Sequence, residues 1–276
     1  MYGKWAAWRT LGLAALLCLG GCASANGGES ASPSAASPSA VSPSGEAPAN
    51  PTVGASGSGK SPGKTVPLDF VPVLVVPLNE VKVSDDALYR RIDKVTASGR
   101  DVEVRLLQDA EAPNDIHAYL WDDGHAYDIG LVGSYGMEGV QEPRASDVTG
   151  DGAEELLVVG AMGASYEELK VLHYEATSGK WSNVLTMGTP AIVDLDGDGR
   201  DDLVAVSAGS LPSYLQIGRW NEGRFELADA ATALGSADVR LVRADGEPRI
   251  QSGPEGEPGG RLYRYAGGEL IPSEES

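Results

Sequence analysis

The chain has 276 residues and a formal net charge of −19 at pH 7. This length allows one sizeable domain or two small ones. The strong negative charge disfavours binding to nucleic acids and to anionic lipid surfaces, and it favours divalent cations. The sequence has two cysteines, Cys18 and Cys22, both near the N-terminus. We therefore expect no disulfide framework and no thiol chemistry in the folded part.

The N-terminus has the features of an export signal. Lys4 and Arg9 supply positive charge, and the apolar stretch from Leu11 to Leu19 follows them. This stretch is too short to span a bilayer as a permanent helix. The pattern predicts a signal peptide over residues 1–21.

The segment Leu19-Gly20-Gly21-Cys22 resembles a bacterial lipobox. That resemblance implies that Cys22 is acylated and becomes the first residue of the mature protein. Two or more acyl chains are enough for stable anchoring. We therefore expect an exported protein, held by lipid at the extracytoplasmic side of the cell membrane.

Residues 22–64 are rich in Ser, Ala, Pro and Gly and contain Ser-Pro-Ser three times. A segment with so few bulky apolar residues cannot offset its chain entropy by burial, so we expect a disordered linker. Residues 54–61 match the phosphate-loop pattern G-x-x-x-x-G-K-[ST]. A working phosphate loop follows a buried strand and opens a helix, whereas Pro51 precedes this one and Pro62 follows it. We therefore expect no nucleotide.

Two acidic loops with glycines form the strongest pattern in the chain. Residues 194–202 read DLDGDGRDD and precede the apolar run LVAV, and residues 147–155 read DVTGDGAEE and precede LLVV. Carboxylates this dense repel one another unless a cation lies among them. Oxygen ligands at alternating positions, with glycine where the chain turns sharply, suit calcium.

The remainder of the sequence predicts strands and turns. Four aromatic hairpins have turn glycines at 124, 179, 223 and 268, and the acidic loops are 47 residues apart. A period near 45–50 residues is typical of propeller blades. We predict an all-β, propeller-like stack of about four blade units over residues 100–276. The stack is either incomplete or joined by an extra N-terminal unit, and residues 65–99 remain of uncertain structure.

Some local details follow from the same patterns. The runs 156–159 and 203–206 are apolar without alternation, which predicts strands that are covered on both faces. Residues 102–106 and 239–242 alternate, which predicts one wet face. We expect a short helix over residues 84–92 and an extra strand over 71–76.

The pattern D-x-D-G-D-G-x-x-D-L before a short apolar strand resembles the FG-GAP/VCBS repeat of integrin-type propellers and bacterial surface proteins. The likeness covers residues 145–160 and 192–207. It implies calcium ligands at the following positions: Asp194, Asp196, Asp198, Arg200 (by its carbonyl) and Asp202 in the stronger loop, and Asp147, Thr149, Asp151, Ala153 (by its carbonyl) and Glu155 in the weaker one. Thr149 and Glu155 depart from the pattern, because Thr adds no charge and Glu is longer.

An EF-hand is the other calcium loop to consider. It needs a bidentate acid at its twelfth position and a helix after it. The twelfth positions here are Ala205 and Val158, within apolar runs, so we reject an EF-hand. The alternative without an ion is a pair of plain Asp-Gly turns.

We find no catalytic constellation in the sequence. The histidines are His117, His125 and His173, and neither G-x-S-x-G nor H-E-x-x-H occurs. A turn at residues 122–124 places Trp121 opposite His125 and Ile129 opposite His117, so these two histidines are not cross-strand partners. The aromatic residues Trp121, Trp181 and Trp220 are expected mainly in the core between blades, with sugar stacking as the alternative.

Three functions remain open at this stage. The first is a calcium-stabilised surface module that binds an envelope or extracellular protein or glycan. The second is a polysaccharide-acting enzyme or its accessory domain, which needs a deep cleft with converging acids. The third is an assembly scaffold for another envelope protein, which needs an exposed apolar patch or strand edge.

Overall fold

The computed structural model describes residues 63–84, 87, 89–207, 214–253 and 260–273. All described residues lie in one compact unit, Ser58–Ser276. The predicted signal peptide, Cys22 and nearly all of the predicted linker lie outside the described residues.

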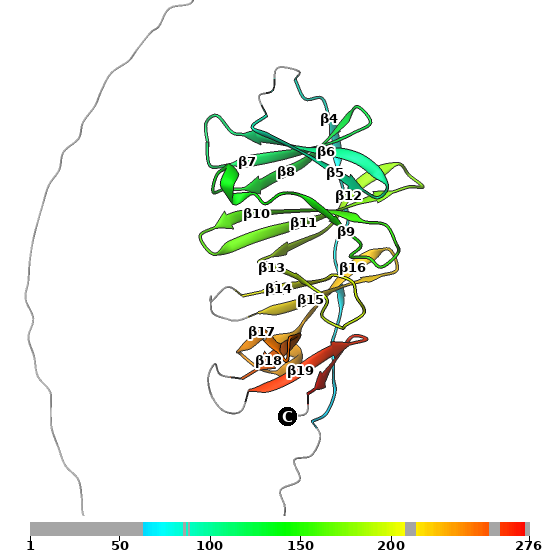
Figure 1. Cartoon of the computed structure of the whole chain (residues 1–276), viewed down its shortest axis with the longest axis vertical. Coiled ribbons are helices and arrows are strands. Elements are labelled where there is room, and N and C mark those ends of the chain that lie inside the picture. The colour runs from blue at the N-terminus through cyan, green and yellow to red at the C-terminus, as the bar shows by residue number, and fades with distance from the viewer. Residues whose placement is uncertain (1–62, 85–86, 88, 208–213, 254–259, 274–276) are drawn as a thin grey trace, which may run out of the picture. The chain divides into compact units, whose positions relative to one another are not determined.

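The described part is almost entirely β-structure, as the hairpin pattern predicts. Four antiparallel sheets of five strands follow one another in chain order (Figure 1). Each sheet takes four strands that are consecutive in sequence and a fifth from the N-terminal segment. The predicted propeller-like stack of four units is confirmed.

The four sheets have the following strands. The first contains β5 (Arg91–Ala97), β6 (Arg100–Gln108), β7 (Ile116–Asp122) and β8 (His125–Gly133). The second contains β9 (Arg144–Ser146), β10 (Glu155–Gly163), β11 (Tyr166–Glu175) and β12 (Lys180–Gly188). The third contains β13 (Pro190–Val193), β14 (Asp202–Val206), β15 (Leu215–Asn221) and β16 (Arg224–Asp229). The fourth contains β17 (Val239–Ala244), β18 (Glu247–Ser252), β19 (Arg261–Ala266) and β20 (Glu269–Pro272).

The fifth strands all come from one extended segment, Val66–Val81, which we call the spine. It contributes β1 (Val66–Pro67) to the fourth sheet, β2 (Val71–Pro72) to the third, β3 (Val76–Pro77) to the second and β4 (Asn79–Val81) to the first. The spine thus passes the sheets in the reverse of chain order (Figure 1). The single strand predicted over 71–76 is wrong: β2 and β3 are two short strands on different sheets, and residues 73–75 between them are not in a strand.

Tight turns join the strands of the hairpins. Asp123-Gly124 and Glu222-Gly223 have positive φ at both positions, of 48° and 84° and of 49° and 81°. Positive φ at both central residues defines the type I′ turn, which matches the twist of antiparallel strands. Because the β7–β8 turn has two residues, Asp122 pairs with His125, and His117 pairs with Leu131. The predicted partners Trp121 and Ile129 are wrong, but the two histidines are indeed not cross-strand partners.

Three clusters of buried apolar residues lie between consecutive sheets. In β10, Leu156 and Val158 belong to the cluster that the first two sheets share, whereas Leu157 and Val159 belong to the cluster between the second and third. Both faces of β10 are therefore covered, as predicted. In the described residues no cluster joins the first sheet to the fourth, so the stack is open.

Because the stack is open, each end sheet has one face packed against its neighbour and one face exposed to solvent. In β6 of the first sheet, Val102, Val104 and Leu106 are buried, while Glu103 and Arg105 lie on the opposite face. The Arg105 guanidinium lies 3.8 Å from the centre of the Trp121 ring on this outer face. An end sheet has no neighbour on that side, so alternate residues stay polar.

Helices are minor in the described residues. Helix α1 (Ala230–Leu234) is capped by Asp229, which accepts a hydrogen bond from the Thr232 amide, and η1 (Met137–Gly139) is a single 3₁₀ turn. The helix expected over residues 84–92 is wrong at its C-terminal end, where β5 begins at Arg91. There the alternating residues pair with β6 instead. None of the described helices is long and apolar enough to cross a membrane.

Candidate metal centre

The stronger acidic loop joins β13 to β14 at the end of the third sheet. Its two glycines, Gly197 and Gly199, have φ of 83° and 86°, which L-residues rarely adopt. The chain therefore folds back on the first aspartate: Asp194 accepts from the Gly197 amide at 2.7 Å and from the Gly199 amide at 3.0 Å. Asp202 closes the loop by accepting from the Leu195 amide at 2.9 Å.

This folding brings three carboxylates together. Asp194, Asp196 and Asp202 each offer an oxygen, and these oxygens lie within 4.8 Å of one another. All three side chains are partly buried. In the described part of the chain, this is the single group of three His, Cys, Asp or Glu side chains with that geometry.

The electrostatics of the cluster favour a cation. The pKa of Asp202 is raised from 3.8 to about 6, chiefly because burial penalises the charged form, and Asp196 and Asp198 add repulsion. The Leu195 amide opposes this shift but does not cancel it. A divalent cation bound among these oxygens would offset this repulsion.

The other two implied ligands of this loop lie differently. The Asp198 carboxylate accepts from Arg200 Nε at 2.8 Å and also contacts Nη2, so Arg200 lowers the pKa of Asp198. Asp198 is not part of the three-carboxylate group. The Arg200 guanidinium reaches the neighbouring loop, where Nη1 donates to the Gly150 carbonyl at 3.3 Å.

The weaker loop joins β9 to β10 and repeats the same hydrogen-bond pattern. Asp147 accepts from the Gly150 amide at 2.6 Å and the Gly152 amide at 3.1 Å. Glu155 accepts from the Val148 amide at 3.1 Å, as Asp202 does from Leu195. The Ala153 amide donates to Asp151 at 2.8 Å, as the Arg200 amide does to Asp198. The two loops are therefore one structural unit used twice.

The two loops differ in the surroundings of the acidic residue that closes them, Asp202 in the stronger loop and Glu155 in the weaker one. Glu155 is fully buried, and His173 Nδ1 lies 3.1 Å and Thr149 Oγ1 lies 3.3 Å from its Oε1. The hydrogen bond to Glu155 raises the pKa of His173. The weaker loop therefore has an imidazole beside its closing carboxylate, whereas the stronger loop has only carboxylates in its three-residue group. His173 is 18 residues from Glu155 in the sequence, and no local pattern indicated this contact.

Side chains also tie the two loops together. Asp201 accepts from Ser146 Oγ at 2.8 Å and from Arg144 Nη1 at 3.2 Å. Gly150 has a φ of 74°, which L-residues rarely adopt, and a Cβ there would also displace the Arg200 guanidinium, whose Nη1 would lie 2.2 Å away. The loop of the third sheet is thereby fixed to the loop of the second.

The remaining sequence candidates are dispersed. His125 pairs with Glu80 at 2.8 Å, on a different sheet from His173. Trp181 is fully buried between the first two sheets, and Trp220 packs against the cluster between the second and third. Trp121 instead lies on the outer face of the first sheet, beneath Arg105.

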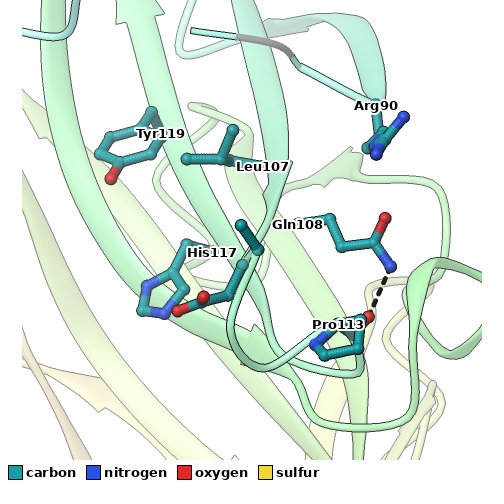
Figure 2. A pocket seen from close by; sticks show the side chains of 8 residues that line it. Arg90, Leu107, Gln108, Pro113, His117 and Tyr119 are labelled. Carbon is teal, nitrogen blue, oxygen red and sulfur yellow. Dashed lines mark hydrogen bonds between the residues drawn. The ribbon is translucent and has the colours of Figure 1, made fainter. Parts of the chain in front are cut away.

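A cavity of about 770 Å³ also lies on this outer face. Figure 2 shows Leu107, His117 and Tyr119 along it, with Arg90 on the opposite side. Its one carboxylate, Asp109, already accepts from the amides of Glu111 and Ala112 at 2.8 and 3.2 Å. The cavity therefore does not present the pair of acids that glycoside hydrolysis requires.

No protein-family model, no curated protein and no solved structure matches the chain.

Proposed function

We propose that this protein is an exported, lipid-anchored binding module whose sheet stack is stabilised by calcium at the Asp194 loop. The observation that carries the proposal is the convergence of Asp194, Asp196 and Asp202. Carboxylate oxygens of partly buried aspartates are the ligand type that calcium prefers. The resemblance of both acidic loops to FG-GAP/VCBS repeats supports the same ion.

The ion has a structural role in this proposal. It neutralises the three aspartates at the point where β14 enters the stack, and β14 contributes Leu203 and Val204 to clusters on its two faces. Extracellular calcium modules bind with dissociation constants of roughly 10⁻⁴–10⁻³ M, so millimolar calcium contributes about 1–2 kcal/mol. The binding partner is an envelope or extracellular protein or glycan, and neither nucleic acid nor nucleotide is a partner.

Thermal unfolding of the full chain, with calcium and with a chelator, tests the ion site. We expect calcium to raise the midpoint by roughly 2–8 °C in the parent, from 1–2 kcal/mol at this chain length. Asp196→Thr, which copies the residue type at the equivalent position of the weaker loop, should lose most of that rise. Glu142→Ala is the matched control, because it removes one exposed carboxylate outside the acidic loops. An equal calcium effect in all three proteins would refute the site.

Membrane fractionation tests the anchor separately. We expect the parent to sediment with membranes and Cys22→Ser to appear in the soluble exported fraction, because the acyl chains attach at that sulfur. The calcium response of Cys22→Ser should match that of the parent. Retention of the variant on membranes would contradict lipid anchoring and leave the ion site intact.

A further inference from the structure

The spine contains a triplet that repeats every five residues. Each triplet has Val, then Pro, then Leu or Val, and the three copies are Val66-Pro67-Leu68, Val71-Pro72-Val73 and Val76-Pro77-Leu78. Each copy makes the same contacts on a different sheet. The valines pair with Leu270, Leu227 and Asn183, which are 43 and 44 residues apart. The third residues donate their amides to the carbonyls of Gly268, Phe225 and Trp181, at 3.0, 2.8 and 2.9 Å.

The period of five thus matches the repeat of the sheets. Each triplet pairs with the last strand of one sheet, and β4 pairs with β8 in the same way. We call the edges of these four strands, β8, β12, β16 and β20, the acceptor edge. Pro67, Pro72 and Pro77 are exposed and lack an amide hydrogen. They limit the pairing of a further strand outside the spine, which protects the edge.

The third residue of each triplet closes one interface between sheets. Leu78 packs against the cluster between the first and second sheets, Val73 against the next cluster and Leu68 against the last. The acceptor edge can therefore recognise an extended chain in two ways. Its strands form backbone hydrogen bonds with the chain, and the interfaces between the sheets receive an apolar side chain at every fifth position. This is strand addition with side-chain pockets.

Each contact of the spine with this edge is small. β1, β2 and β3 each form two residue pairs, and β4 forms three. The spine is joined to the first sheet through residues 82–90, between β4 and β5. Release can therefore proceed one sheet at a time, and the released segment exposes Leu68, Val73 and Leu78 to water. An identical segment from another molecule satisfies the same edge.

We propose that the acceptor edge is a strand-binding surface and that two copies of this protein exchange spines through it. A second copy is the occupant because the fit is to this sequence, with Val-Pro and an apolar residue at every fifth position. Exchange of an identical element restores every native contact in the dimer, so it costs mainly the entropy of association. With the lipid anchor proposed above, confinement of many copies to one membrane would raise their effective concentration and favour exchange.

Disulfide trapping between two molecules tests this proposal. Both variants are made in the full chain with Cys18→Ser and Cys22→Ser, which removes the native thiols. One variant then carries Val76→Cys, and the other carries Asn183→Cys. These positions are directly paired between β3 and β12, and Cα atoms of paired antiparallel residues lie at a distance that a disulfide can bridge. The two variants are mixed at high concentration, warmed below the unfolding midpoint to allow exchange, and oxidised after dilution.

We expect a covalent dimer of one Val76→Cys chain and one Asn183→Cys chain. The matched control replaces Asn183→Cys with Ser178→Cys, an exposed residue in the turn before β12 that is not paired with the spine. Its dimer yield measures random collision and should be severalfold lower. A chain carrying both Val76→Cys and Asn183→Cys should close an internal disulfide and run as a monomer.

Two results would overturn the proposal. If the internal disulfide forms but the mixed dimer does not exceed the Ser178→Cys control, the spine stays on its own stack and exchange does not occur. If neither disulfide forms, the spine does not hold the register on which the proposed surface depends.

Discussion

At the scale of single residues, the buried acids show how the stack tolerates charge. Asp122, Glu155 and Glu226 are the buried polar residues among those described, and each contacts a basic group: Arg100, His173 and Arg219 respectively. A buried carboxylate without such a partner carries a large desolvation penalty. Asp202 has the least compensation, because its neighbours Asp196 and Asp198 carry the same charge.

This imbalance predicts a pH dependence at Asp202. The pKa of the folded state is about 6 and the ordinary value is 3.8. Because the folded state binds the proton more tightly, the contribution to stability is fully present below about pH 3.8 and is lost as the pH rises through about 6. In chelator, we expect the melting midpoint of Asp202→Asn, relative to the parent, to rise between pH 4 and pH 6 and then level off.

Above pH 6, saturating calcium should make the melting midpoint of the parent higher than that of Asp202→Asn. The ion stabilises the parent, whereas the substituted side chain offers it no negative charge. Differential scanning fluorimetry across pH 4–8, with chelator and with calcium, measures both effects. A midpoint difference that does not change with pH in chelator would show that Asp202 ionises normally.

At the scale of elements, polar contacts join neighbouring sheets as specifically as the apolar clusters do. Asp122 of β7 accepts from Arg100 Nε at 2.7 Å and Nη2 at 2.8 Å. It also accepts from Trp181 Nε1 of β12 at 2.8 Å. The Arg100 guanidinium in turn lies 4.5 Å from the centre of the Tyr174 ring. One carboxylate therefore ties the first sheet to the second.

We expect Asp122→Ala to lower the free energy of unfolding by about 2–3 kcal/mol, because it leaves the buried donor of Trp181 and the partly buried donors of Arg100 without an acceptor. Urea denaturation measures this loss. In a Trp181→Phe background, which removes one of those donors, the same substitution should cost less. Equal costs in both backgrounds would mean that the Trp181 hydrogen bond contributes nothing to the joint.

At the scale of the whole described unit, the spine connects sheets that are far apart in sequence. Two leucines of the spine, Leu74 and Leu78, differ sharply in environment. Leu78 packs between the first two sheets, whereas Leu74 is 80% exposed. They therefore provide a matched pair in the same element, with the same side chain and opposite surroundings.

We expect Leu78→Ala to cost about 2–3 kcal/mol, at the low end of the range for buried leucines because Leu78 is only partly buried. Leu74→Ala should change the free energy of unfolding by less than about 0.5 kcal/mol, as for other exposed positions. Chemical denaturation of both variants measures the difference. Similar losses at the two positions would contradict the idea that the spine stabilises the stack through its inward residues.

The sequence by itself determined the features that depend on neighbouring residues. Hairpin turns, the period near 45 residues, the strands covered on both faces and the fold of both acidic loops depend on local backbone preferences and on apolar patterns. The repeat of Val-Pro at residues 66, 71 and 76 was visible as well, but nothing local indicated its partners.

The tertiary structure decided which distant groups meet. It placed the spine across four sheets, gave Glu155 a histidine as partner and brought Asp194 and Asp196 together with Asp202 but not with Asp198. These outcomes depend on strand register and on the order of sheets, which a single residue's neighbours in sequence do not specify. A shift of one residue moves a side chain to the opposite face of its sheet. Local sequence patterns therefore define the repeated unit, while the acidic site and the path of the spine depend on how the units are stacked.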